Sequence, residues 1–148
     1  MCRVSIPINC DKFHRTKDKQ LLLDELRAFD ADRVMLNFET VLDGHVVLAD
    51  GDDYQRLLER MREACVFFKQ HGYEVGAWLW GLQFGPGLSF TEITTLSGKP
   101  ARGFACPSDP AFRDAFARCL RDVARAGVDL ILLNDDLRFG AQPVLLLI

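Results

Sequence analysis

The stretch Tyr73-Glu74-Val75-Gly76-Ala77-Trp78-Leu79-Trp80 decides the fold, because it is a short apolar run that directly follows a long amphipathic one. The preceding run, from Asp52 to Gln70, carries apolar residues at helical spacing, and Gly72 separates the two runs. An amphipathic run followed at once by a short apolar run is typical of a helix that leads into a parallel strand. We therefore predict a helix over 52–70 and a strand over 73–80.

The same alternation recurs on both sides of this stretch. Three further apolar runs predict strands, and two further amphipathic runs predict helices. The strands are expected over Arg3 to Ile8, Arg33 to Phe38 and Val128 to Leu133; the helices are expected from Asp18 to Phe29 and from Ser108 or Asp109 up to Gly127. Strands that alternate with helices predict an α/β fold with a parallel sheet. We expect about four βα units, arranged as a (β/α) half-barrel.

Each predicted helix has one apolar face that should pack on the sheet. Asp52 or Asp53 is expected to cap the second helix, and Pro110 occupies a first-turn position of the third. The three faces are Leu21, Leu22, Leu26 and Phe29; Leu57, Leu58, Met61, Cys65 and Phe68; and Phe112, Phe116, Leu120 and Val123.

The connection from Gly81 to Pro110 is far longer than an ordinary βα loop. Two extended candidates, 90–95 and 102–105, flank the turn-rich segment Ser97-Gly98-Lys99-Pro100. This arrangement predicts a hairpin within the long loop after the third strand.

Residues 1–148 are expected to form a single partial barrel domain that is truncated after the fourth strand. Only ten residues follow Arg138, and a parallel crossover needs about a dozen or more. The last five residues, 144–148, are wholly apolar. We expect them to form an edge strand, to dock under a helix or to contact a partner.

Composition limits the classes of function. Of 148 residues, 49% are hydrophobic and 26% are charged, as in a globular protein, and the net charge of -3 offers no basic face for nucleic acid. No charged leader with a long apolar segment is present, so we expect a cytoplasmic protein that does not bind membranes.

The five cysteines lack metal-binding spacing and are expected to be reduced core thiols. No glycine-rich phosphate loop occurs, and we expect neither a metal nor a cofactor.

Side-chain alternation divides each strand into two sets. One set is aliphatic and is expected to lie beneath the helices: Val4, Ile6, Ile8, Val34, Leu36, Phe38, Val75, Ala77, Leu79, Ile131 and Leu133. The other set is mixed and is expected to face the barrel lumen: Ser5, Pro7, Asn9, Met35, Asn37, Glu39, Gly76, Trp78, Trp80, Leu132, Asn134 and Asp136. Sites in parallel βα folds gather at the carboxyl ends of the strands, where this second set becomes polar.

The residues at these strand ends suggest carbohydrate chemistry. Carboxylates serve proton transfer in glycosidic cleavage, and tryptophan faces suit the apolar faces of sugar rings. The catalytic candidates are Asp135, Asp136 and Glu39, and the substrate-binding candidates are Asn9, Asn37, Trp78, Trp80, Asn134 and Arg138. Several have a structural alternative: the indoles as core aromatics, the aspartates as a strand end or helix cap, Glu39 as an ordinary loop carboxylate, and Arg138 as the ion-pair partner of an aspartate.

Two stretches resemble known enzymes. "CPSDPAFR", residues 106–113, resembles the segment before the third barrel helix of beta-galactosidase-like hydrolases, and "GVDLILLNDDLR", residues 127–138, resembles the fourth strand of alpha-galactosidase-like and uncharacterised hydrolases. The resemblance covers the amino-terminal half of a glycoside hydrolase (β/α)8 barrel. It implies substrate-contacting or catalytic carboxylates at Asp135 and Asp136, with Trp78, Trp80 and Glu39 lining the substrate. Asn134 stands where related strands often carry a carboxylate.

Three functions follow as expectations. The first is a glycoside hydrolase-like barrel fragment that is inactive alone, since the chemistry needs two carboxylates at a defined separation and the neighbours Asp135 and Asp136 point to opposite faces. The second is a sugar-binding module without catalysis, closed by homodimerisation through the open sheet edges and the apolar tail. The third is a flavodoxin-like domain in which Asp11, Asp135 and Asp136 bind magnesium.

Overall fold

A computed structural model describes residues 3–37, 52–79, 84 and 88–133, without the side chain of Asp53. Four parallel strands form its main sheet: β1 (Ser5–Asn9), β2 (Arg33–Asn37), β3 (Glu74–Leu79) and β6 (Leu130–Leu133), in the order β1-β2-β3-β6. Four helices accompany the sheet: α1 (Cys10–Arg15), α2 (Lys19–Ala28), α3 (Asp52–Gln70) and α4 (Pro110–Arg125). The predicted α/β class with a parallel sheet is confirmed, and four strands are compatible with a half-barrel.

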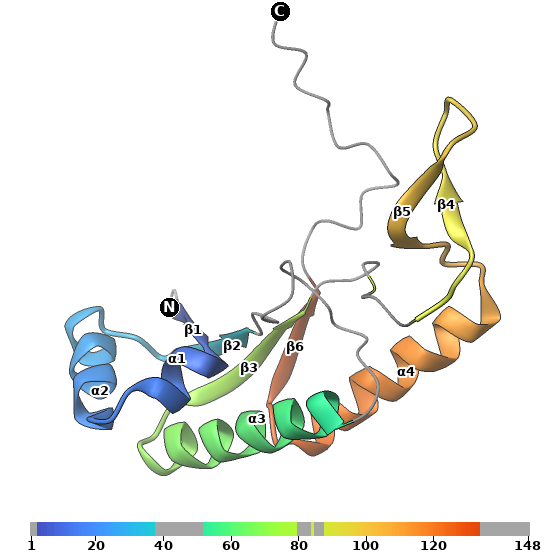
Figure 1. Ribbon diagram of the computed structural model, residues 1–148. Helices are drawn as coiled ribbons and strands as arrows, with labels where there is room; N and C mark the ends of the chain where they lie inside the picture. Colours follow the sequence, from blue (N-terminus) through green and yellow to red (C-terminus); the bar gives the residue numbers. More distant parts are fainter. Residues whose placement is uncertain (1–2, 38–51, 80–83, 85–87, 134–148) are drawn as a thin grey trace, which may run out of the picture.

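The strand order explains where the helices lie. Successive strands are added on one side only, and right-handed crossovers then place every connecting helix on the same face. Figure 1 shows α3 and α4 running along one face of the sheet. A doubly wound, flavodoxin-like sheet has a point where the strand order reverses, and its ligand binds in the crevice there. The order of the described strands contains no such reversal.

The core lies between the sheet and the helices, and only one strand parity enters it. Val34, Leu36, Val75, Ala77 and Leu79 are all fully buried and belong to one apolar cluster with side chains of all four helices. The prediction for the aliphatic parity is therefore confirmed in the middle strands. It is wrong for Val4 and Leu133, which are exposed because they lie at or beyond the strand ends.

The opposite face of the sheet is layered. At its amino edge Glu74 accepts from Arg3 at 2.6 Å and from Arg33 at 2.7 Å. In the middle Met35 is buried outside the main cluster and lies over Gly76, where a Cβ atom would approach the Met35 sulfur to 2.6 Å. Asn9, Asn37 and Trp78 form the row at the carboxyl edge.

The helix boundaries follow local signals. Asp18 caps α2 through Gln20, Asp109 caps α4 with Pro110 at the first turn, and Gly72 and Gly127 adopt positive φ after α3 and α4. The predicted face of α2 is wrong by one position. Leu22, Leu23 and Leu26 are buried, whereas Leu21 and Phe29 are exposed. Phe29 is the C-cap residue, so the helical spacing does not carry it onto the buried face.

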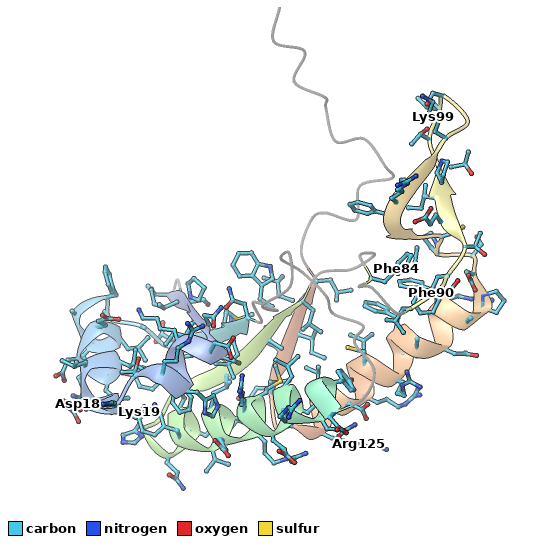
Figure 2. All side chains as sticks on the ribbon, in the orientation of Figure 1. Asp18, Lys19, Phe84, Phe90, Lys99 and Arg125 are labelled. Atoms are coloured by element: carbon cyan, nitrogen blue, oxygen red, sulfur yellow. The ribbon has the colours of Figure 1, made fainter. Side chains whose placement is uncertain are left out.

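The hairpin expected in the long connection is present as β4 (Glu92–Thr94) and β5 (Pro100–Ala105), which pair antiparallel. It stands apart from the main sheet beside the start of α4 (Figure 1). A chain of aromatic contacts links Phe84 to Phe90, Phe90 to Phe112 and Phe112 to Phe116 at 5.2–5.6 Å. Phe84 and Phe90 lie at the hairpin's base and Lys99 at its tip (Figure 2).

Candidate functional site

Three of the predicted site residues come together at the carboxyl edge of the sheet. Asn9 is in register with Asn37, and Asn37 is in register with Trp78, so the three occupy neighbouring positions on β1, β2 and β3. Leu132 of β6 continues this row. Side-chain alternation places the row on the face opposite the helices. Asn9, Asn37, Trp78 and Leu132 are called the carboxyl row below.

The carboxyl row contains unsatisfied polar atoms. Asn9 Nδ2, Asn37 Oδ1 and Trp78 Nε1 are shielded from solvent and have no hydrogen-bond partner within the described part of the chain. Leaving a buried donor or acceptor unpaired costs about 1–3 kcal/mol, so such groups are rare and often mark a functional position. Three of them in adjacent register positions make this edge the strongest candidate for a ligand site.

The orientation of Asn9 is set by the helix that follows it. Its Oδ1 accepts hydrogen bonds from the backbone N–H groups of Asp11 at 2.7 Å and Lys12 at 3.1 Å, as an N-cap does. Because an amide has its acceptor and its donors on different atoms, this contact fixes Nδ2 as the atom that is left over. The unpartnered group of Asn9 is therefore a donor.

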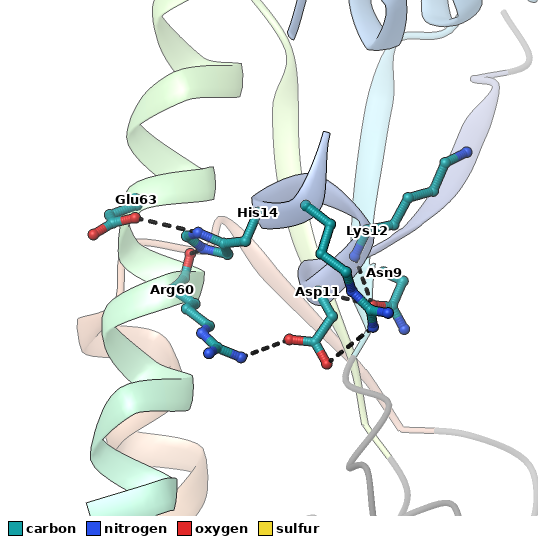
Figure 3. A network of polar contacts seen from close by, with 7 residues as sticks. Asn9, Asp11, Lys12, His14, Arg60 and Glu63 are labelled. Carbon is teal, nitrogen blue, oxygen red and sulfur yellow. Dashed lines mark hydrogen bonds and ion pairs between the residues drawn. The ribbon is translucent and has the colours of Figure 1, made fainter. Parts of the chain in front are cut away.

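An ion pair between helices holds the capped segment in place (Figure 3). Asp11 is 7% exposed, and its Oδ1 accepts from Arg60 of α3 at 2.7 Å, while Arg15 lies 3.8 Å from Oδ2. His14 adds contacts from Nε2 to the Arg60 carbonyl at 3.2 Å and from Nδ1 to Glu63 at 3.5 Å. Sequence reasoning missed α1, although Asn9 before a segment with Asp11 early and Arg15 late is the pattern of a capped helix.

The magnesium alternative has no support among the described residues. Both carboxylate oxygens of Asp11 face arginines, so its charge is already neutralised. Within the described ranges no group of three His, Cys, Asp or Glu residues could hold a metal ion. Asp135 and Asp136, the other two proposed ligands, lie outside the described residues.

Six predicted site residues also lie outside the described ranges: Glu39, Trp80, Asn134, Asp135, Asp136 and Arg138. The catalytic assignments of Glu39, Asp135 and Asp136 therefore stay predictions. So do the substrate-binding assignments of Trp80, Asn134 and Arg138, and the expected contacts of residues 144–148. The polar side chains of the carboxyl row are two amides and an indole, which bind ligands without supplying an acid or a base.

The described cysteines fit the core role expected from the sequence. Cys10, Cys65 and Cys119 are buried, and none of the four described cysteines, Cys106 included, forms a disulfide. Burial raises the pKa of the Cys10 thiol to about 12 and that of Cys65 to about 11, and for Cys10 the neighbouring Cys65 adds to the increase. Burial likewise raises the pKa of Cys119 to about 11. These thiols stay protonated at neutral pH and are poor nucleophiles.

Two aspartates outside the carboxyl row have structural roles and lowered pKa values. The Thr91 N–H, at 2.6 Å, is the main cause for Asp109, and the Ala111 and Phe112 N–H groups add to it. Burial opposes the shift of Asp129, but the hydrogen bonds from Lys69 at 2.6 Å and from the Val75 N–H at 3.0 Å outweigh it and lower its pKa. Asp109 thereby joins α4 to the hairpin, and Asp129 joins α3 to β3.

A separate open pocket lies on α3. Its described lining contains no residue of the carboxyl row, and Val66 and Phe67 provide its apolar part. The described lining residues are Arg62, Glu63, Val66, Phe67 and Gln70. None of the described helices is both long enough and apolar enough to cross a membrane.

Comparison with family models, with curated proteins and with solved structures gave no match for this chain.

Proposed function

We propose that this chain is half of a glycoside hydrolase-like (β/α)8 barrel and that its carboxyl row binds carbohydrate. The observation that supports the proposal is the set of three unsatisfied polar atoms on Asn9, Asn37 and Trp78. Sugars present hydroxyl groups that both donate and accept hydrogen bonds, and the indole supplies an apolar face beside its N–H group. A carbohydrate matches these needs better than an apolar ligand or a metal ion.

Several features support the half-barrel. Four parallel strands in chain order are half the number in a complete (β/α)8 barrel. The face opposite the helices is layered from an ion-paired amino edge, through Met35 and Gly76, to a polar carboxyl edge. Barrel interiors are likewise filled by layers of side chains, with the active site at the carboxyl end of the strands.

Binding is tested by calorimetric titration of the full chain with galactose, glucose, lactose and cellobiose. We expect at least one of these sugars to bind at millimolar concentration. Trp78→Phe, which keeps an aromatic ring but removes the N–H donor, should weaken that binding about tenfold. Leu96→Ala is the control, because Leu96 is fully exposed at the hairpin turn. Binding of none of the four sugars, or equal binding by Trp78→Phe, would overturn the proposal.

Catalysis is measured separately with nitrophenyl galactosides and glucosides. Hydrolysis needs two carboxylates at a defined separation, and the candidates are Glu39, Asp135 and Asp136. We expect the chain alone to release no nitrophenol. Release that disappears in Asp136→Ala would contradict this expectation and would assign the chemistry to this chain.

A sugar-binding homodimer is the second candidate, and the exposed Leu132 favours it. Leu132 lies in β6, the last of the described strands in the sheet, with 49% of its surface exposed, on the face that no described helix covers, called the uncovered face below. The Val4 carbonyl accepts a hydrogen bond from the N–H of Arg33 at the start of β2. Because the backbone groups of successive strand residues face opposite neighbours, those of Pro7 face the outer edge of β1. A proline there lacks the donor that a partner strand would need. Sedimentation equilibrium distinguishes the homodimer from a monomeric half-barrel. A dimer supports closure of the barrel by two copies, and a folded monomer across the concentration series rules out the homodimer.

A further inference from the structure

We propose that Asn9 determines the specificity of the carboxyl row, and that this row selects ligands presenting oxygen acceptors over ligands presenting an ammonium group. The inference rests on the proposed function and deepens it. It identifies which atom of each residue faces the ligand and what chemical class of sugar follows from those atoms.

Asn9 and Trp78, the two outer polar residues of the carboxyl row, present hydrogen-bond donors. Asn9 can offer only Nδ2, because its Oδ1 is occupied by the N–H groups of Asp11 and Lys12. Trp78 can offer only Nε1–H, because an indole has no acceptor. Both atoms are without a partner among the described residues. Each therefore needs an acceptor from the ligand, which a hydroxyl or carboxylate oxygen provides and an ammonium does not.

The middle position has the opposite requirement. Asn37 presents an unpartnered Oδ1 between the two donors, since β2 lies between β1 and β3. Adjacent strands are about 4.8 Å apart, so the donor, the acceptor and the second donor are evenly spaced across the sheet. Hydroxyl groups satisfy all three positions, because each can donate and accept. An ammonium group satisfies only Asn37.

Helix α1 keeps the Asn9 donor in this orientation. If the cap were lost, the amide could rotate and present either end to the ligand. The ion pair from Arg60 to the buried Asp11, at 2.7 Å, ties α1 to α3 (Figure 3). Arg60 is therefore a positioning residue that acts through α1, while Asn9 itself contacts the ligand.

Two substitutions separate the cap from the ligand contact. Asp and Ser are both good N-cap residues, so Asn9→Asp and Asn9→Ser keep the acceptor for α1 but lose the Nδ2 donor. Asn9→Ser is neutral, and Asn9→Asp adds a negative charge that attracts an ammonium. Thermal unfolding of both variants should match wild type closely, which confirms that α1 remains capped.

The experiment is calorimetric titration of the full chain with galactose, glucose, lactose and cellobiose, and with galactosamine and glucosamine, below neutral pH where the amines are charged. We expect wild type to prefer a neutral sugar to its amino counterpart about tenfold, and Asn9→Ser to lose about tenfold in affinity for the neutral sugar. Asn9→Asp should reverse the preference.

The outcomes distinguish the two proposals. Wild type that binds none of the four neutral sugars overturns the proposed function. Wild type that binds a neutral sugar, together with Asn9→Ser and Asn9→Asp proteins that bind it equally well, overturns the assignment of Asn9 and leaves carbohydrate binding standing. Wild type that prefers the amino sugars overturns the acceptor requirement alone.

Discussion

The two faces of the main sheet are built from the same four strands, but one carries only apolar side chains in its centre and the other carries charged and polar side chains at its edges. Beneath the helices, Val34, Leu36, Val75, Ala77 and Leu79 are completely buried in one apolar cluster. On the other face lie an Arg33–Glu74 ion pair, a methionine over a glycine, and, at the carboxyl edge, three polar atoms without partners in the described chain.

This difference separates stability from function. Burial of aliphatic side chains is the dominant favourable contribution to folding, so the helix-covered face holds the domain together. Unsatisfied polar atoms cost free energy, and among the described residues three of the four such atoms lie in one row at the carboxyl edge, while the fourth, Arg33 Nε, belongs to a side chain that is ion-paired to Glu74 at the amino edge. Substitutions on the two faces should therefore affect different measurements.

The largest expected effect tests the covered face. Leu36→Ala should lower the free energy of unfolding by about 2–5 kcal/mol, because it leaves a cavity at a fully buried position. Leu132→Ala, on the uncovered face of β6, is the matched control and should cost less than about 1 kcal/mol. Urea unfolding of both variants measures the contrast. Equal losses would mean that the uncovered face is packed as tightly as the core.

A smaller effect is expected at the middle layer of the uncovered face. A methyl group at Gly76 would meet Met35 Sδ at 2.6 Å, Met35 Cε at 2.9 Å and Leu130 Cγ at 3.0 Å. Since methionine is flexible, Gly76→Ala should destabilise by only about 1–2 kcal/mol.

The double variant Gly76→Ala with Met35→Ala checks the cause of this loss. If the methyl group displaces Met35, the Gly76→Ala loss should be absent in the Met35→Ala background. Additive losses in urea unfolding would show that the contact with Met35 is not the reason.

The smallest effect concerns the hairpin at the carboxyl side. The Thr91, Ala111 and Phe112 N–H groups lower the Asp109 pKa, so its stabilising contribution is present at neutral pH and is lost as the pH falls below the usual aspartate value of 3.8. The variant Asp109→Asn keeps a capping side chain without the charge. Wild type should therefore lose more stability than Asp109→Asn between pH 6 and pH 3, measured as urea midpoints; parallel curves would contradict the assignment.

Periodicity and capping signals predicted most of the fold. The helix over 52–70 was confirmed with identical bounds, the other helices and strands agree within two residues at most ends, and the hairpin was confirmed between residues 92 and 105. These elements have long periodic runs or strong boundary residues such as Asp18, Asp109 and Gly127. Asp52, expected as a possible cap, instead begins α3 itself.

The features that the sequence did not predict depend on tertiary contacts. Helix α1 has only six residues and no apolar periodicity, and the buried pair of Asp11 with Arg60 connects segments far apart in the chain. The alternation of β1, β2 and β3 predicted Asn9, Asn37 and Trp78 on one face, and the strand register, which alternation does not give, brings them into one row. It could not show that Asn9 also caps a helix, which determines the atom it presents.

The order of the strands also affects how the chain folds. Each described strand of the main sheet pairs with the strand of the βα unit before it, so no strand must wait for a later one to be inserted between itself and its neighbour. During synthesis, β2 can join β1, and β3 can join β2, as soon as each has emerged from the ribosome. The domain can therefore assemble by stepwise growth from its amino-terminal strand, and the growing edge of the sheet is always its newest strand.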